Sequence, residues 1–505
     1  MERTITPAEM RTLEADFMAR CGVAPALLME HAAQGVCDAL VRRCPGGRAL
    51  FLCGGGNNGG DGYAAARLWQ TRGGKAVVMA LPGEPRGDAL MNRTLALLRG
   101  IPLSIAAEGC ALPPCDIIVD ALFGTGLNRP VEGLAGEIIR LVNRSGKPVI
   151  AVDIPSGLDG LTGRVLGDAI RATQTVTFHR IKRGLVLGDG AVHTGALTVH
   201  PILIPKDFGT REGWAVMEPG DLKLIPPRPA DSHKGSFGRV AIFAGSRGMA
   251  GAAAFAANAC VKAGAGLTTL LCRESLLPML QVLSPGAVCL PLPEQDGRLT
   301  CEAAGIIRQA LLTADAAAAG CGLGQSDDVP PLLTLFRDAG CPVVWDADAL
   351  NLLAATPSLL PLGPKAVITP HPGEAARLLG CTTADILADM PAALSALRQR
   401  TGAMVLLKGA RTLMTDGDHT AVNRYGSPAL AKGGSGDILT GILMALLARR
   451  LPCSPLETIQ LGALIHGLTG IRAARRFGES CATPQALVGM LRLDNKDLPP
   501  FSGCL

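Results

Sequence analysis

Polar, oxygen-bearing residues interrupt a glycine-rich segment in the first half of the chain. Residues 54–62 read GGGNNGGDG and carry Asn57, Asn58 and Asp61 among their glycines. Glycine lets the backbone approach a ligand closely, and free amide groups at a helix start attract anions, so the segment suits a phosphate group. A phosphate cradle needs only glycine, so the extra carboxamide and carboxylate groups indicate further chemistry. A glycine-rich turn without a ligand is the simpler alternative.

Two later segments offer matching oxygen atoms at the ends of predicted strands. Asp120 opens DALFGTGL, and residues 153–159 read DIPSGLD, with Asp153 and Ser156. In a doubly wound sheet such loops meet at the carboxyl edge, where ligands bind. Carboxamide, carboxylate and hydroxyl oxygens meeting there suit a hard cation, and the low charge favours a monovalent ion over Mg²⁺. Alternatively, Asp120 and Asp153 only cap the turns that follow them.

A hydride-transferring dehydrogenase is a weaker interpretation of the same loop. Gly54, Gly56 and Gly59 satisfy the G-x-G-x-x-G spacing of dinucleotide-binding loops, which is a weak signal by itself. Such enzymes also place an acidic residue at the end of the next strand, to hold the ribose. Here that strand ends in Leu81-Pro82, and Glu84 comes only after the proline.

A second glycine-rich turn precedes a long apolar segment near the C-terminus. Residues 431–437 read AKGGSGD, and the apolar segment 438–447 follows. Backbone amides of such a turn, with a helix dipole behind them, form an anion hole for a transferring phosphoryl group. Asp437 stands where a base would meet an attacking hydroxyl. An ordinary helix cap is the equally simple alternative.

Other predicted strands of the second half end in chemically active turns. VLLKGART at 405–412 gives a basic, glycine-containing turn suited to nucleotide phosphate, and TPHPGE at 369–374 holds His371 between two prolines. WDADALN at 345–351 and GCGLG at 320–324 end two further strands. Parallel strands bring such turns to one sheet edge.

Strands and helices alternate along both halves, which is the pattern of α/β sheets. We expect one helical segment from Pro7 to about Arg43, a strand at 49–53, and a helix from about Tyr63 to Gln70. Further strands are expected at 76–81, 117–119, 149–152, 239–244, 267–272, 316–319, 343–346, 366–369 and 405–407. Proline-rich residues 201–229 interrupt this pattern. We therefore predict domains at 1–212 and 231–505, joined by a linker at 213–230.

Composition excludes several classes of protein. Among 505 residues, 48% are hydrophobic and 18% charged, which excludes a disordered chain. The net charge of +5 is dispersed, so no nucleic-acid partner is expected. No apolar run is long enough to span a membrane. The 16 cysteines are scattered without a C-x-x-C pair, and the N-terminus has no signal-peptide pattern, so we expect a cytoplasmic protein with free thiols.

The motifs of the first half carry a resemblance to a known family. GGGNNGGDG, VDALFGTGL and VDIPSGLDG, in this order, resemble the NAD(P)H-hydrate epimerase domain of the bifunctional NAD(P)H-hydrate repair enzymes, over about residues 1–210. The resemblance implies that Asn58, Asp120 and Ser156 bind K⁺, and that Asp153 is the favoured acid/base group. It implies hydrate contacts from Asn57, Asn58, Gly59, Gly60, Asp61, Gly124, Thr125, Gly126, Leu127, Asn128, Arg129, Pro130 and Asp153. Residues 177–185 are similar to a later family motif, from which His179 departs.

The second half resembles the ribokinase-like superfamily and, more closely, the NAD(P)H-hydrate dehydratase. SHKGSFGRV, AGSRGMAGAA, CGLG, WDADALN, TPHPGE, LLKGART and KGGSGD match in order, over about 225–495. The resemblance implies that ADP or AMP contacts Lys408, Gly409, Ala410, Arg411, Thr412 and Gly436. It implies that the hydrate contacts Gly251, Ala252, Gly322, His371 and Asp437, where the alanine-rich run leaves the register at Ala252 open.

The resemblance as a whole implies a two-domain α/β enzyme, with a Rossmann-like doubly wound sheet followed by a ribokinase-like domain. We expect it to interconvert R and S hydrates of NADH and NADPH and then to dehydrate the S hydrate with ADP, which releases AMP and phosphate. K⁺ is expected at the epimerase site and Mg²⁺ at the dehydratase site, in a homo-oligomer whose size stays open. Asp437 is expected as the dehydratase base. The choice between NADHX and NADPHX, and between ADP and ATP, also stays open.

Two alternatives remain at this point. One is a small-molecule kinase of the ribokinase-like group, fused to a dinucleotide-binding module without activity of its own; the loops WDADALN and TPHPGE argue against it. The other is an N-terminal half that acts only in binding or assembly. The presence of Asn58, Asp120, Asp153 and Ser156 argues against that role.

Overall fold

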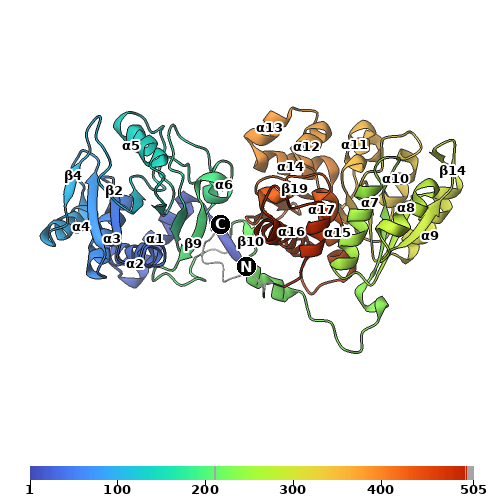
Figure 1. Ribbon diagram of the computed structural model, residues 1–505, viewed down its shortest axis with the longest axis horizontal. Helices are drawn as coiled ribbons and strands as arrows, with labels where there is room; N and C mark the ends of the chain where they lie inside the picture. The colour runs from blue at the N-terminus through green and yellow to red at the C-terminus, as the bar shows by residue number, and fades with distance from the viewer. Residues whose placement is uncertain (210–211, 495, 497–505) are drawn as a thin grey trace. The chain divides into compact units, whose positions relative to one another are not determined.

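The computed structural model describes residues 1–209, 212–494 and 496, and the chain forms two compact units (Figure 1). The first unit runs over Glu2–Trp214, and the second begins at Ala215. The predicted linker, 213–230, contains structured segments of the second unit. In it, β10 (Ala215–Val216) pairs with β21 (Thr420–Asn423), and Glu218 begins a 3₁₀ turn over Pro219–Leu224. Residues 210–211, 495 and 497–505, which include the end of the second predicted domain, lie outside the described residues.

A parallel sheet organises the first unit. Its strands, in spatial order, are β4 (Leu103–Ile105), β3 (Lys75–Ala80), β2 (Arg48–Cys53), β5 (Ile117–Ala121), β6 (Val149–Val152), β7 (Gln174–Phe178) and β9 (Ala196–His200). Every pairing between these strands is parallel. The chain order reverses between β2 and β5, so a crevice is expected at the carboxyl ends of these two strands. The doubly wound sheet predicted from the sequence is confirmed.

Side chains of each strand alternate between two hydrophobic cores. On one face, Phe51 of β2 packs with α2 (Pro25–Arg43) and α3 (Asn57–Thr71), and on the other face Leu50 and Leu52 pack with α5 (Gly133–Arg144). Successive side chains of a strand point to opposite faces, so a strand covered on both sides is apolar throughout. This explains why β2 reads as a continuous apolar run.

The single helix expected from Pro7 to Arg43 is wrong, because two helices occupy this stretch. The first, α1 (Pro7–Cys21), begins at a capping box of Thr6 and Glu9 and ends at Gly22, whose φ of 64° is left-handed. Pro25 then starts α2. A left-handed glycine ends a helix, and proline suits the first turn of the next one. The apolar spacing therefore continues across the point where α1 ends and α2 begins.

The second unit is built on a larger, mixed sheet. Its strands, in spatial order, are β13 (Val288–Leu292), β12 (Leu267–Arg273), β11 (Arg239–Phe243), β16 (Ala316–Ala319), β17 (Val343–Trp345), β18 (Ala366–Ile368), β19 (Met404–Leu407), β20 (Thr412–Thr415), β21 and β10. Pairing is parallel from β13 to β19 and antiparallel from β19 to β21.

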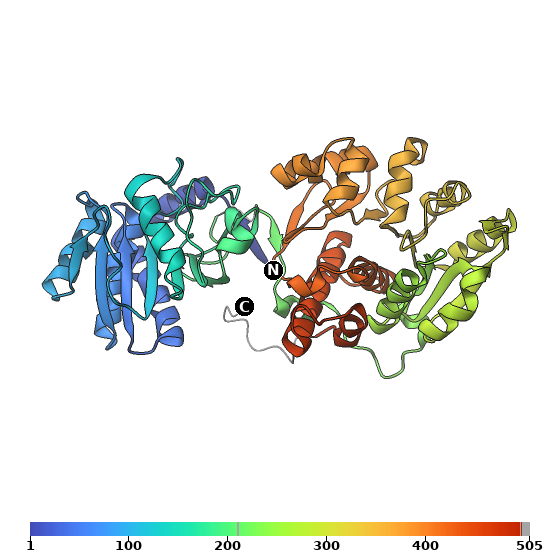
Figure 2. The same cartoon turned by 45° about the horizontal axis from the view of Figure 1, so that its top comes forward.

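Small residues allow two helices of this unit to approach closely. Both views place α15 (Ser435–Ala448) beside α7 (Ala250–Lys262) (Figures 1 and 2). A Cβ on Gly441 of α15 would lie 2.2 Å from the carbonyl oxygen of Ala256, so the close approach requires glycine there. Among the described residues, no helix has the length and apolar character needed to cross a membrane.

Candidate active sites

A cavity of about 660 Å³ opens at the reversal between β2 and β5. One wall comes from α1, through Met10, Arg11, Glu14 and Met18. The predicted site residues that line it are Asn57, Asn58, Asp61, Gly124, Thr125, Gly126, Leu127, Asn128, Arg129 and Asp153. Three predicted positions, Gly59, Gly60 and Pro130, are not among its lining residues. The topology therefore gathers segments from distant parts of the sequence around one space.

The glycine-rich segment is half loop and half helix. We expected a helix from about Tyr63, but α3 begins at Asn57, so Asn58 and Asp61 project from its first turns. A Cβ on Gly59 would lie 1.9 Å from the carbonyl oxygen of Gly54, so packing of the chain on itself requires this glycine. Around Gly55 and Gly56, which line the cavity, a Cβ would meet nothing within 4 Å.

Asp153 forms a buried ion pair beside the cavity. It follows β6 in a left-handed conformation, with a φ of 63°, which is unusual for a residue other than glycine. Its Oδ1 accepts hydrogen bonds from Lys182 Nζ at 2.6 Å, Thr177 Oγ1 at 3.0 Å and the Phe178 amide at 3.3 Å. The Lys182 side chain is only 2% exposed, so the pair is fixed in position.

Two further carboxyl groups face this ion pair. Burial, followed by the charges of Asp153 and Glu14, raises the pKa of Asp61 well above its ordinary value, although Lys182 acts in the opposite direction. Burial also raises the pKa of Glu14, against the opposing charges of Lys182 and Arg11. The cavity thus combines one carboxylate in an ion pair with two carboxyl groups whose pKa burial raises.

Asp120 and Ser156 form a separate buried pair. The Ser156 hydroxyl lies 2.6 Å from Asp120 Oδ1, and the Ser156 amide donates to Asp120 Oδ2 at 2.8 Å. Burial raises the pKa of Asp120 to about 6, and hydrogen bonds from Ser156 and the Leu122 amide partly offset that effect. Asn58 lines the cavity, and its buried Nδ2 has no hydrogen-bond partner among the described residues.

Sequence reasoning missed Lys182 and Glu14. Lys182 stands in segment 177–185 between Arg180 and Arg183, and no local feature distinguishes it from these other basic residues. Glu14 sits on α1 with no distinguishing spacing, so nothing in the sequence singles it out. His179 is buried, and burial lowers its pKa to about 4, so this ring is neutral at physiological pH.

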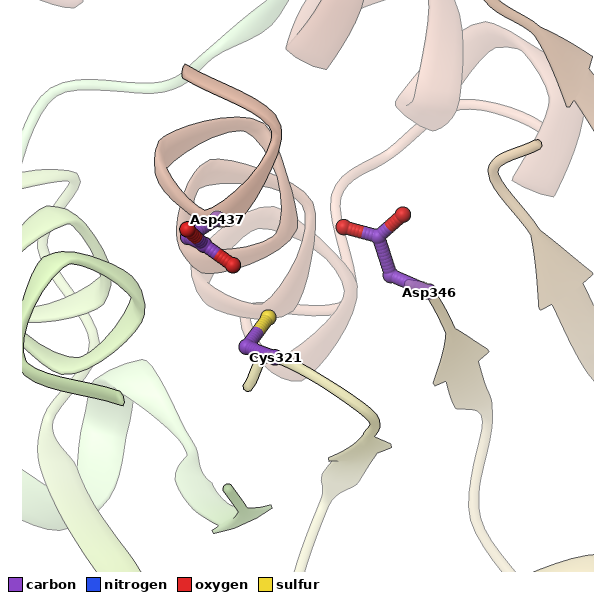
Figure 3. Close-up of side chains that lie close together, drawn as sticks. All are labelled: Cys321, Asp346 and Asp437. Atoms are coloured by element: carbon purple, nitrogen blue, oxygen red, sulfur yellow. The ribbon is translucent and has the colours of Figure 1, made fainter. Parts of the chain in front are cut away.

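Asp437 lies at the centre of a second cluster (Figure 3). It occupies the first turn of α15, so the expected start of this helix at residue 438 is a few residues late. Ligand atoms of Cys321, Asp346 and Asp437 lie within 4.8 Å of one another. Burial, followed by the charge of Asp346, raises the pKa of Asp437 to about 7, while a hydrogen bond with Cys321 and the charge of Lys408 lower it.

Lys408 neutralises Asp346 in this cluster. Its Nζ lies 2.9 Å from Asp346 Oδ1, and Thr440 donates to Oδ2 at 2.9 Å. Burial disfavours the charge on Asp346, but Lys408 wins and lowers the pKa of this carboxyl. Glu374 Oε2 lies 3.9 Å from the same ammonium. The Lys408 side chain therefore points toward Asp346 and not toward open solvent.

The remaining predicted residues of this half surround the cluster at different depths. His371 caps α12 (Pro372–Leu379), with Nδ1 accepting from the Gly373 amide at 3.0 Å. Gly322 is left-handed and a Cβ there would lie 2.8 Å from Ala252 Cβ, whereas Gly251 has open space around it.

Exposed Gly409 and Ala410 form the turn between β19 and β20, which begins at Thr412. Arg411 donates to the Arg424 carbonyl at 2.7 Å, and Gly436 lies near Lys408.

His466 is a further group that sequence reasoning missed. It lies on α16 (Pro455–Phe477), and its Nε2 is 3.0 Å from both the carbonyl and the hydroxyl oxygen of Ser435. Burial lowers the pKa of His466 to about 4, so a neutral imidazole fixes the start of α15. Lone histidines on apolar helices are mostly core residues, and the sequence offered no reason to choose this one.

Comparison with known proteins identifies the family. Residues 240–491 match the family described as NAD(P)H-hydrate dehydratase, and residues 25–184 match the family described as YjeF-related protein N-terminus. A relative from Moorella thermoacetica, named bifunctional NAD(P)H-hydrate repair enzyme Nnr, is 37% identical, over 94% of this chain and 93% of its own length. The chain belongs to the bifunctional NAD(P)H-hydrate repair enzymes.

Two solved structures of other proteins are similar to about half of this chain. One is a ribokinase-like superfamily protein from Enterococcus faecalis, with 26% identity, a TM-score of 0.48, and coverage of 54% of this chain and 92% of that one. The other is the ADP/ATP-dependent NAD(P)H-hydrate dehydratase from Bacillus subtilis, co-crystallised with ATP and Mg²⁺. It has 27% identity and a TM-score of 0.45, and covers 52% of this chain and 91% of that one.

Membership in this family confirms the activities that the sequence predicts. The chain is an NAD(P)H-hydrate epimerase and an NAD(P)H-hydrate dehydratase, which together repair a damaged cofactor. The match to the dehydratase family lies in the second unit, so the cavity of the first unit is the candidate epimerase site. Relatives named bifunctional NAD(P)H-hydrate repair enzyme match nearly the full chain, which argues against a fused small-molecule kinase and against an N-terminal half that acts only in binding or assembly.

Proposed function

We propose that the cavity of the first unit epimerises the hydrate at C6 of the reduced nicotinamide ring, with Asp153 in contact with the reacting atoms. The ion pair between Asp153 and Lys182 carries this proposal. A carboxylate held by a nearly buried ammonium and two further donors is fixed in place at the edge of a cavity. Such fixed geometry is what general acid–base catalysis requires.

The glycine-rich start of α3 is proposed to hold the dinucleotide. Gly55 and Gly56 leave open space, so a pyrophosphate group can approach the backbone amides at the positive end of the helix. Asn57 and Asn58 and the loop 124–130 would contact the remainder of the hydrate. Arg129, which lines the cavity, would add a positive charge.

Asn58, Asp120 and Ser156 are proposed to bind K⁺ near this site. The Ser156 hydroxyl lies 2.6 Å from Asp120 Oδ1 and 3.1 Å from the Phe123 carbonyl oxygen, so one hydroxyl proton serves two acceptors. Within the described residues, no basic side chain forms an ion pair with buried Asp120. Carboxylate and hydroxyl oxygens gathered in this way are the ligand type of hard cations. When bound, K⁺ would offset the charge of Asp120 and of the dinucleotide.

In the second unit, we propose that ADP phosphorylates the hydroxyl of the S hydrate, which leaves AMP. Asp437 would accept the hydroxyl proton while the oxygen attacks the phosphorus atom, supported by its pKa of about 7. Phosphate then leaves C6 with the electron pair of its C–O bond as a proton leaves C5, and NAD(P)H is restored. Backbone amides at the start of α15 would stabilise the phosphoryl group.

The nucleotide is proposed to lie along the turn of residues 408–412 and Gly436, and the hydrate near Gly251, Ala252, Gly322 and His371. Lys408 already neutralises Asp346, so these side chains do not form a cage for Mg²⁺ made only of protein ligands. The arrangement fits an ion held mainly by nucleotide phosphates. When bound, Mg²⁺ would neutralise the charge that develops on the phosphoryl oxygens.

A single assay tests both activities. The chain is incubated with a mixture of R and S hydrate, with and without ADP and Mg²⁺, and the absorbance of NADH is followed. We expect complete conversion that requires ADP. The epimerase proposal is contradicted if conversion stops once the S hydrate is consumed and the R hydrate then disappears no faster than it epimerises spontaneously. No conversion with ADP or ATP contradicts the dehydratase proposal.

The K⁺ proposal has its own test. Asp120→Ala should slow epimerisation far more than ADP-dependent dehydration of pure S hydrate, because the two reactions use different units. Replacing K⁺ by a bulky organic cation at equal ionic strength should have the same effect on the unaltered chain. Equal epimerase rates in the two salts would mean that Asp120 and Ser156 only shape the loops.

A further inference from the structure

Asp61 and Asp153 share the epimerase cavity but have different surroundings. Asp153 is bound by an ammonium, a hydroxyl and a backbone amide. Asp61 projects from the start of α3, and no hydrogen bond or ion pair to its carboxyl group is found within residues 1–209 and 212–494. One group therefore has the partners that a carboxylate needs, and the other has none.

The charges around Asp61 favour its neutral form. The carboxyl faces Asp153, which follows β6, and Glu14 on α1, both of which repel a second negative charge. Lys182 on β8 (Ile181–Lys182) attracts one, but this ammonium is already bound to Asp153. Burial adds to the cost of ionisation, and together these effects raise the pKa of Asp61. Two carboxyl groups whose surroundings differ in this way can divide acid and base roles between them.

We propose that Asp61 is the general acid and Asp153 the general base of hydrate epimerisation, and that Lys182 is a positioning residue that holds Asp153. This inference rests on the proposed function of the cavity and extends it from one catalytic group to a pair. It assigns a proton-transfer role to a residue that the sequence predicted only as a contact of the hydrate.

The reaction balances with water as the only co-reactant. The lone pair of N1 forms a second bond to C6 as the C6–O bond breaks, and the leaving oxygen takes the bonding pair and a proton from Asp61. Water then attacks the other side of C6, and the N1=C6 electron pair returns to N1. Asp153 accepts the proton of that water. Transfer of this proton back to Asp61 through solvent resets the site.

Glu14 is a less suitable acid. It stands one helical turn from Arg11 on α1, and the charges of both Arg11 and Lys182 favour its ionised form. Glu14 therefore acts in this scheme through its charge, which helps to keep the proton on Asp61. Glu14→Gln is consequently the matched comparison for Asp61→Asn, because both exchange a cavity carboxyl group for an amide.

The test compares epimerase pH profiles of the full chain and its variants. We expect Asp61→Asn to lower kcat by at least about 100-fold with little change in KM, because loss of a general acid commonly has this size. The unaltered chain should lose activity as pH rises through the pKa of Asp61, since the acid must be protonated. Glu14→Gln should lower kcat much less and move this alkaline decline to lower pH.

Lys182 is tested by rescue. Lys182→Met should lower kcat, and Lys182→Arg should restore most of it, because a cation beside Asp153 is what the scheme requires. A residue needed only for packing would not be rescued by the bulkier arginine. In every variant, ADP-dependent dehydration of pure S hydrate reports that the second unit is intact, and thermal unfolding reports whether the first unit is folded.

The outcomes separate this inference from the proposed function. If the unaltered chain does not accelerate epimerisation, the function proposed for the cavity is wrong. If it does but Asp61→Asn stays within about twofold, or if Glu14→Gln instead causes the large loss, the acid assignment is overturned. In water enriched in ¹⁸O, each inversion should place label on C6. Inversion without label would overturn the transfer of the Asp61 proton to the leaving oxygen.

Discussion

At the scale of single residues, both sites place a carboxyl group where burial resists its charge. For Asp437 the effect is strong enough to bring the pKa to about 7, because Asp346 adds a second negative charge nearby. In the proposed mechanism the same group is a base at neutral pH, and its burial in charged form reduces the stability of the fold. Such conflicts between stability and activity are common at catalytic positions.

Asp437 should therefore control the pH dependence of dehydration. We expect kcat/KM for S hydrate to rise as pH increases through about 7, because only the ionised carboxyl accepts a proton. Asp437→Asn should lower the rate by at least about 100-fold and leave epimerisation intact. If this variant retained half of the dehydratase rate, Asp437 would be a helix-capping residue and not the base.

The stability of this variant supplies the control. The folded pKa of Asp437 lies above its ordinary value of 3.8, so the stability of the unaltered chain declines as pH rises from about 4 to 7. The asparagine variant lacks this decline and should have the higher Tm at pH 8. Loss of activity together with a lower Tm would instead indicate damage to the fold.

At the scale of elements, the turn from β2 into α3 depends on glycine for two different reasons. A Cβ on Gly59 would lie 1.9 Å from the Gly54 carbonyl oxygen, whereas a Cβ on Gly56 would meet nothing within 4 Å. Gly59→Ala should lower the Tm of the first unit and its epimerase activity together. Gly56→Ala should leave the Tm unchanged and raise KM, and thermal unfolding with epimerase kinetics would measure both. Equal losses of Tm in the two variants would contradict this distinction.

The sequence predicted the alternation of elements and the convergence of three loops well, because both follow from periodicity and from sheet topology. It placed the start of α3 too late, because glycine at 59, 60 and 62 lowers helix propensity while tertiary packing holds the helix together. It joined α1 to α2 because the apolar spacing continues past Gly22. It did not find Lys182, because ion pairs between residues 29 positions apart leave no local pattern.

At the scale of the whole molecule, each unit contains a complete candidate site with its own acid or base. The dehydratase proposal uses the S hydrate, and the epimerase proposal supplies it from R. The residues proposed to carry the two reactions are drawn from separate units. A single substitution should therefore remove one activity without the other.

Two inactive variants should complement each other in solution. With ADP and a hydrate mixture, Asp153→Asn should convert the S hydrate, and the R hydrate only as fast as it epimerises spontaneously. Asp437→Asn should convert neither. An equal mixture of both should convert nearly all of it, since the free hydrate diffuses from one protein to the other. Failure of the mixture, with each intact activity present, would indicate that hydrate does not leave the chain between the two reactions.

Apart from Glu14, the wall that α1 gives to the epimerase cavity separates substrate choice from chemistry. Asp61, Asp120 and Asp153 are fixed by the sheet and by α3, whereas α1 is held at its start by a capping box and at its end by Gly22. Residues along its cavity side, Arg11 among them, can change without disturbing a strand. Natural variation in the dinucleotides that such enzymes accept would then accumulate on this helix, while the reacting groups stay constant.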